Sequence, residues 1–143
     1  MEKKRLLVAY LTNECQLDVH ISDVDESRWG EGEFSTAHGD YLVLDDDEAD
    51  IVVRSRILDL VWAFMPEFLV PHLIDGINED VVKILQEKCE SANEPLTAMI
   101  KDVDHFIDDA VKSDGRGHFL SGYDGNESEY TFKGETVYIY RTN

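Results

Sequence analysis

The chain has 143 residues, and its 31 acidic against 13 basic residues give a formal net charge of −18. This length favours one domain, and 43% hydrophobic residues distinguish it from a disordered acidic tail. The charge excludes non-specific binding to nucleic acid or to an anionic membrane, because both need a positively charged surface.

The N-terminus imitates a secretion signal, but its apolar stretch spans only residues 6–11 and no small-residue cleavage site follows. No segment approaches the length of a membrane span. Cys15 and Cys89 are too few and too far apart for a disulfide framework, and neither has a zinc-binding spacing. These features predict a soluble, cytoplasmic protein.

The first half of the chain begins with short elements. Residues 5–11 form an apolar run that is either a strand or a helix. Residues 16–22 alternate between apolar and polar side chains, which is typical of a half-buried strand. Residues 23–40 are rich in Gly, Ser and acidic side chains and predict a loop, and residues 41–44 form another apolar run.

The first long helix is predicted to begin at Asp45. Asp45 and Glu48 have the spacing of a capping box, in which each side chain bonds the backbone N–H of the other residue. Apolar residues continue around the circumference as far as Met65, which indicates a central helix that Pro66 ends or kinks.

Two more long helices follow. Asn78 or Glu79 opens the second, whose apolar stripe extends to Ala92. Pro95 suits the first position of the third helix, which ends at the Asp-Gly pair 114–115.

The C-terminal residues predict a β-hairpin, with aromatic alternation on both sides of a Lys-Gly turn at residues 133–134. The predicted class is therefore α+β, with three main helices and a small antiparallel β-sheet that includes this hairpin. We expect one domain over residues 1–143. Its parts are an acidic N-terminal segment (14–50), a helical core (45–113) and a C-terminal turn and hairpin (114–143).

The negative charge is concentrated in residues 14–50, where thirteen acidic residues and one basic residue give −12. Capping at residues 45–48 explains only four of these acids. Acids at alternate strand positions, or four apart on a helix, lie about 6–7 Å apart, which can imitate a row of phosphates. We therefore predict a partner-binding surface, extended by one face of the third helix; the alternative is a solvated surface that serves solubility. The predicted residues are Asp18, Asp23, Asp25, Glu26, Trp29, Glu31, Glu33, Asp104 and Asp108.

The glycine-rich stretch 114–127 is a second candidate site. In an enzyme, Arg116 would clamp an anion, His118 would act as general base and Asp124 would orient it; in a binding module, Tyr123 would stack on the ligand. The alternative is an ordered turn system without a ligand. No nucleophile-elbow or phosphate-loop pattern is present. The candidate ligand-binding residues are Arg116, His118, Ser121, Tyr123 and Asp124.

Metal motifs are absent from the sequence. The five histidines show no HxH or HExxH spacing. An EF-hand pattern that starts at Asp124 fails because Glu129 occupies the position that needs glycine. We expect no metal, no cofactor and no catalytic residue.

Several segments resemble a family of small uncharacterised proteins carried by bacteriophages and other mobile elements. The resemblance covers about residues 40–143 and departs at Met65, where the family pattern has Asn. It implies no activity, but it implies a genetic setting in which small acidic proteins often disable host defence or host nucleic-acid enzymes. The segments are YLVLDDDEAD (41–50), WAFMPEFL (62–69), KCESAN (88–93), DGRGHFLSGYDG (114–125) and YIYRTN (138–143).

The leading hypothesis is a non-enzymatic phage-type inhibitor or DNA-mimic decoy in the host cytoplasm. Its partner would be a basic host protein, such as a nuclease, a restriction enzyme or a CRISPR component, with no direct contact to nucleic acid or membrane. The first alternative is a small enzyme or anionic-ligand-binding module built on residues 114–127. The second alternative is an assembly protein whose acidity only keeps it soluble.

Overall fold

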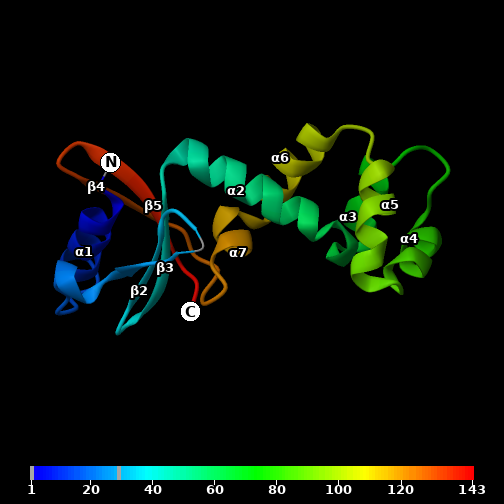
Figure 1. Cartoon of the computed structure of the whole chain (residues 1–143). Helices are drawn as coiled ribbons and strands as arrows, with labels where there is room; N and C mark the ends of the chain where they lie inside the picture. The colour runs from blue at the N-terminus through cyan, green and yellow to red at the C-terminus, as the bar shows by residue number, and fades with distance from the viewer. Residues whose placement is uncertain (1, 29) are drawn as a thin grey trace. The chain divides into compact units, whose positions relative to one another are not determined.

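The computed structural model describes residues 2–28 and 30–143, which form two compact units (Figure 1). The first unit comprises the chain up to Val53 and from Arg116 onward, and the second comprises Arg54–Gly115. The broad α+β class is confirmed, but the described residues form seven α-helices instead of three main ones. The single domain stays a prediction. No helix of the described residues has the length and apolar character that crossing a membrane requires.

The first unit contains a five-stranded antiparallel sheet in the order β1-β2-β3-β5-β4. Its central strands come from opposite ends of the chain, with Tyr41 opposite Arg141 and Leu44 opposite Tyr138. The apolar run 41–44 is buried because it belongs to a central strand. The strands are β1 (Asp25–Glu26), β2 (Glu33–Thr36), β3 (Gly39–Leu44), β4 (Ser128–Phe132) and β5 (Glu135–Arg141).

Helix α1 (Lys3–Asn13) packs on one face of this sheet (Figure 1). The ambiguous run 5–11 is therefore helical. Leu7 and Leu11 are completely buried among sheet residues that include Phe34, Val43 and Ile139. Burial of this apolar face stabilises both the helix and the sheet.

The predicted C-terminal hairpin is confirmed by the antiparallel pairing of β4 with β5. Lys133 and Gly134 both have positive φ angles, 51° and 81°. Two positive φ angles in a two-residue loop are the geometry of a type I′ turn, whose twist matches that of the strands.

Two N-terminal predictions are wrong. Residues 16–22 form no strand: Gln16 turns the chain with φ 56°, and only a short 3₁₀ helix, η1 (Ile21–Asp23), follows. Ile21 is 44% exposed, so the alternation does not line one buried face. The predicted loop 23–40 contains β1 and β2, because β2 pairs with β3 across a tight turn at residues 37–38.

Helix α2 (Asp46–Asp59) begins with the predicted capping box. The Glu48 N–H donates to Asp45 Oδ1 at 2.8 Å, and the Asp45 N–H donates to Glu48 Oε1 at 3.0 Å. The helix is shorter than predicted because Asn93 caps its end: Asn93 Nδ2 donates to the Leu58 carbonyl at 2.6 Å. Pro66 therefore does not end α2; it begins α3 (Pro66–Leu69).

The second unit continues with short helices. Asn78 caps α4 as predicted, since its Oδ1 accepts a hydrogen bond from the Val81 N–H at 3.0 Å. The predicted second helix ends early, at Gln86 instead of continuing to Ala92. The elements are η2 (Val61–Ala63), η3 (Val70–His72), α4 (Glu79–Gln86), η4 (Cys89–Ala92), α5 (Asn93–Ala98) and α6 (Val103–Asp114); α7 (Arg116–Leu120) follows in the first unit.

The predicted third long helix is two helices. It breaks between α5 and α6, where Ile100 forms a β-bridge with Leu73 and the Lys101 N–H donates to the His72 carbonyl at 2.8 Å. Asp102 then caps α6 by accepting from the His105 N–H at 3.1 Å. Gly115 ends α6 as predicted, with φ 83°.

Glu48 also gives a pH-dependent link between α1 and α2. Burial opposes its charge, but the hydrogen bonds from Lys3 Nζ (2.7 Å) and the Asp45 N–H outweigh burial and lower the pKa of Glu48. A carboxylate with a lowered pKa stabilises the fold above its unperturbed value of 4.5 and loses that contribution as the pH falls through the folded value.

We therefore expect Glu48→Gln to be less stable than the wild type at pH 7, with a difference that shrinks as the pH falls below about 4.5. Urea unfolding of both proteins at several pH values measures this difference. A difference that stays constant down to pH 3 would contradict the link.

Candidate functional site

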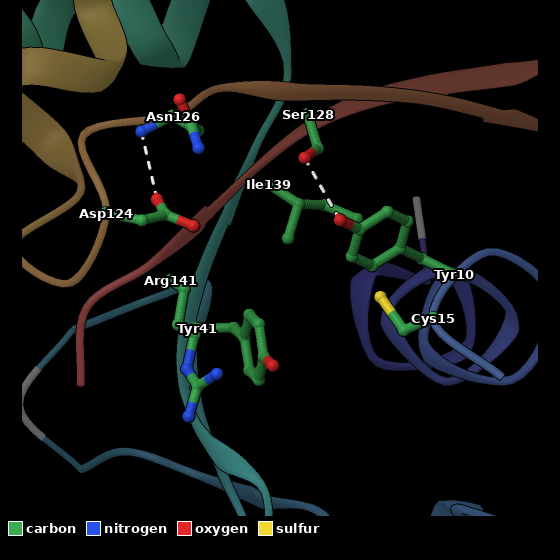
Figure 2. A pocket seen from close by; sticks show the side chains of 8 residues that line it. All are labelled: Tyr10, Cys15, Tyr41, Asp124, Asn126, Ser128, Ile139 and Arg141. Atoms are coloured by element: carbon green, nitrogen blue, oxygen red, sulfur yellow. Dashed lines mark hydrogen bonds between the residues drawn. The ribbon is translucent and has the colours of Figure 1, made fainter. Parts of the chain in front are cut away.

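A pocket with a volume of about 150 Å³ opens in the first unit between α1, the sheet and the turn that precedes β4. Figure 2 shows side chains that approach it from α1 and the residues after it, from the central strands and from the turn. Polar groups dominate the lining. The lining residues are Tyr10, Cys15, Tyr41, Asp124, Asn126, Ser128, Ile139 and Arg141.

Arg141 supplies the positive charge of this pocket. Its guanidinium carbon lies 3.7 Å from the ring centroid of Tyr123 and 6.0 Å from that of Tyr41. Its Nε donates to the Asn143 carbonyl at 2.9 Å. No carboxylate of the described residues forms an ion pair with it. The rings and the Asn143 oxygen thus hold the guanidinium in place, and its charge helps to lower the pKa of Asp124, which lines the same pocket.

Gly39 permits this arrangement. A Cβ atom at Gly39 would lie 2.5 Å from the Asn143 carbonyl oxygen and 2.8 Å from Arg141 Nε. Its φ of 133° also disfavours other residues. Glycine at this position therefore lets β3 approach the arginine and the C-terminus closely.

The opposite side of the pocket carries hydroxyl, amide and carboxylate groups. The Asp124 carboxylate accepts from the Asn126 N–H and from Ser121 Oγ, both at 2.9 Å, and these bonds lower the pKa of Asp124. Tyr10 donates to Ser128 Oγ at 3.0 Å, while burial raises the pKa of Tyr10. This set of hydroxyl, amide and carboxylate groups suits binding of a small polar molecule.

Arg116 lies in a separate network. Its guanidinium contacts Asp46 Oδ1 at 2.9 Å, Asp50 Oδ1 at 3.0 Å and Glu127 Oε2 at 2.8 Å, and its side chain is only 11% exposed. The guanidinium also lies 4.6 Å from the ring centroid of Tyr138. Burial opposes its charge, but the bonds to Glu127 and Asp46 raise the pKa of Arg116. The residue predicted as an anion clamp thus already holds three anions of its own chain.

The other predicted ligand residues are Ser121, Tyr123, Asp124 and His118, and they do not all lie at the pocket. Ser121 is buried, and its Oγ lies 2.6 Å from the Arg141 carbonyl oxygen. Asp124 lines the pocket, while Ser121 and Tyr123 contact lining residues, Ser121 through Asp124 and Tyr123 by stacking on Arg141. His118 is exposed, packs its ring against Phe119 and does not line the pocket. The sequence analysis did not identify Arg141 as a site residue, although its position on β5 places it on the same face as Val137 and Ile139.

All six predicted carboxylates of the N-terminal segment are exposed. Asp25 on the edge strand β1 lies opposite Ser35 on β2, so it shares a face with Glu33, two residues from Ser35. Among the six, within the described part of the chain, only Asp18 has an ion-pair partner, the exposed His20 at 3.7 Å. Trp29, predicted as an anchor, lies outside the described residues. The six are Asp18, Asp23, Asp25, Glu26, Glu31 and Glu33.

Two of these carboxylates, those of Glu26 and Glu31, line a second hollow of about 390 Å³. Lys3 and Lys4 contribute positive charge, but Lys3 is already bonded to Glu48 at 2.7 Å. Five carboxylates therefore face two ammonium groups. The lining consists of Glu2, Lys3, Lys4, Glu26, Glu31, Gly32, Phe34, Asp45 and Glu48.

Asp104 and Asp108, predicted to extend the acidic surface, lie on α6 in the second unit. Both are exposed, and Asp104 accepts a hydrogen bond from Arg54 at 2.6 Å. A continuous acidic surface from residue 14 to α6 stays a prediction.

The second unit also brings together His72, His105 and Asp109, a cluster that the sequence analysis missed. Only the four-residue spacing of His105 and Asp109 on α6 is visible in the sequence. Burial lowers the pKa of His72, while the Asp109 charge acts in the opposite direction.

Comparisons of the chain with profiles of known families, with curated proteins and with solved structures find no match. The resemblance to small phage proteins therefore stays a prediction, and function has to be inferred from the residues themselves.

The Arg116 network gives a stability prediction. We expect Arg116→Met to lower the free energy of unfolding by about 2 kcal/mol, because it leaves three carboxylates without a cation. This value lies between the small contribution of an exposed ion pair to stability and the larger loss when one partner of a buried pair is removed. Arg54→Met is the matched control, since it removes one exposed pair with Asp104 and should cost less than about 1 kcal/mol. Urea unfolding of both variants measures the difference, and equal losses would contradict a framework role for Arg116.

Proposed function

We propose that this protein acts by binding, without catalysis, to a basic nucleic-acid-binding surface of another protein. The observation that supports this best is the exposure of all six carboxylates between residues 18 and 33, five of them without an ion-pair partner in the described chain. Such carboxylates stay hydrated in their own fold and can pair with cations of a partner.

The charge balance of the first unit supports the same proposal. It contains eighteen acidic and seven basic residues. The shortest ion pairs of this unit join Lys3 to Glu48, and Arg116 to Glu127, Asp46 and Asp50. The segment that carries β1 and β2 therefore keeps its charge, and the adjoining hollow offers a concave, net negative place for a lysine or arginine side chain.

The kind of partner follows from this chemistry. A surface that evolved for phosphates presents rows of arginine and lysine, and spaced carboxylates can occupy it in place of nucleic acid. Association should be fast and should weaken with salt, because exposed charges are screened beyond about 8 Å at physiological ionic strength. The resemblance to phage proteins makes a host nuclease, restriction enzyme or CRISPR component the partner that we propose.

Charge reversal tests the proposal. The intact chain, immobilised, is used to capture proteins from nuclease-treated bacterial lysate at low salt, and the affinity of each captured protein is then measured. We expect a basic, nucleic-acid-binding protein, which duplex DNA competes off. The combined substitution of Asp23, Asp25, Glu31 and Glu33 by Lys should weaken its binding by about 100-fold or more, because like charges then face each other.

The matched control places lysine at four exposed acids of the second unit, Asp59, Glu67, Glu87 and Glu90. Both variants have the same net charge, so a difference between them reports position rather than total charge. The proposal predicts that the control keeps binding within about threefold of wild type. Equal weakening by both variants, or none by either, would contradict it.

A second candidate function is binding of a small anion in the Arg141 pocket. The specific observation is the ring-supported guanidinium, which forms no ion pair with an Asp or Glu side chain of the described residues. We expect phosphate or a carboxylic acid to raise the thermal midpoint of the wild type and not that of Arg141→Gln. Arg28→Gln, an exposed arginine outside the pocket, is the control. An unchanged midpoint with every anion tested would exclude this candidate.

A further inference from the structure

Two histidines and one carboxylate converge in the second unit, whereas the six carboxylates that support the proposed function belong to the first. His72 ends η3, and His105 and Asp109 lie one turn apart on α6. From this geometry we propose that the second unit binds a divalent transition-metal ion, with Zn²⁺ as the best match, through the two imidazoles and the Asp109 carboxylate.

The distances fit a tetrahedral ion. Asp109 Oδ2 lies 3.1 Å from His72 Nε2 and 3.5 Å from His105 Nε2, and the three ligand atoms lie within 4.8 Å of one another. Bonds of about 2.0–2.2 Å at tetrahedral angles place neighbouring ligand atoms about 3.3–3.6 Å apart. Small side-chain rotations therefore suffice to bring all three atoms to one ion.

The backbone holds the ligands in register. The segment around His72 is bonded to the chain just before α6: the Lys101 N–H donates to the His72 carbonyl at 2.8 Å, and the Ile74 N–H donates to that of Met99 at 2.9 Å. Asp102 fixes the first turn of α6 through the His105 N–H. Ligands on such supported elements lose little conformational freedom when an ion binds.

The surroundings favour one face for the ion. His72 is only 7% exposed and packs against the rings of Phe68 and Phe106, with centroids 5.4 and 5.3 Å away. The side chains of His105 and Asp109 are 63% and 38% exposed. The cluster is thus walled by aromatic rings on one side and open on the other, so water or an exogenous ligand can supply a fourth donor.

The donor set selects the class of ion. Imidazole nitrogens suit Zn²⁺, Co²⁺, Ni²⁺ and Cu²⁺, whereas Mg²⁺ and Ca²⁺ prefer a shell of oxygens. The alternative for this cluster is a carboxylate that only accepts hydrogen bonds from two imidazoles, which needs no ion and predicts no selective binding.

The test uses the full chain after removal of metals by a chelator. Calorimetric titration with Zn²⁺ is carried out in excess Mg²⁺, which occupies unspecific sites on the acidic surface. We expect one Zn²⁺ per chain, and Co²⁺ should give the intense visible absorption of four-coordinate geometry. His105→Ala and Asp109→Asn should each weaken Zn²⁺ binding by about 100-fold or more, since even loss of an outer-shell partner typically costs 10- to 100-fold.

Asp108→Asn and His38→Ala are matched controls, because both residues are exposed and outside the cluster. Circular dichroism of each variant checks that the fold is retained. Selective loss in the two cluster variants supports the site. Zn²⁺ binding that survives both cluster variants, falls equally in the controls, or is absent from the wild type would overturn it.

Discussion

Arg116 is the cation around which three carboxylates of the first unit are arranged. Without it, Asp46 and Asp50 on α2 and Glu127 before β4 would repel one another where the chain segments meet. Gly117 makes the approach possible, since a Cβ atom there would lie 2.6 Å from the Gly125 carbonyl oxygen. The hydroxyl of Tyr140 also donates to Glu127, so one guanidinium and one carboxylate join α2, α7 and the sheet.

This arrangement changes the meaning of the glycine-rich stretch. Its sequence has the glycines and polar groups of a ligand loop. However, Arg116 forms ion pairs within the protein, and Gly117 allows two backbone segments to approach closely. What remains for a ligand is the other end of the stretch, where Tyr123 and Asp124 meet Arg141. The candidate pocket thus results from the pairing of β5 with β3, which places Tyr41 opposite Arg141, 100 positions later in the chain.

Local signals were predicted well from the sequence. The capping box of Asp45 and Glu48, the Asn78 cap and the turn at Lys133 and Gly134 each depend on residues within four positions of one another. The alternation at residues 16–22 failed because no strand is available to pair with that segment. Likewise, the break between α5 and α6 depends on a bridge to Leu73, and the histidine cluster depends on the same bridge. The break leaves no local pattern in the sequence, and the cluster leaves only the four-residue spacing of His105 and Asp109.

The exposed acids near β1 have one competing structural explanation. Charges on an edge strand prevent pairing with another chain, and β1 is such an edge. However, β1 has only two residues, and so short an edge is already a poor template for pairing. Asp18, Asp23 and Glu31 lie outside any strand and cannot serve this purpose. Since self-repulsion destabilises a compact unit, carboxylates beyond the need of the edge favour a role in binding.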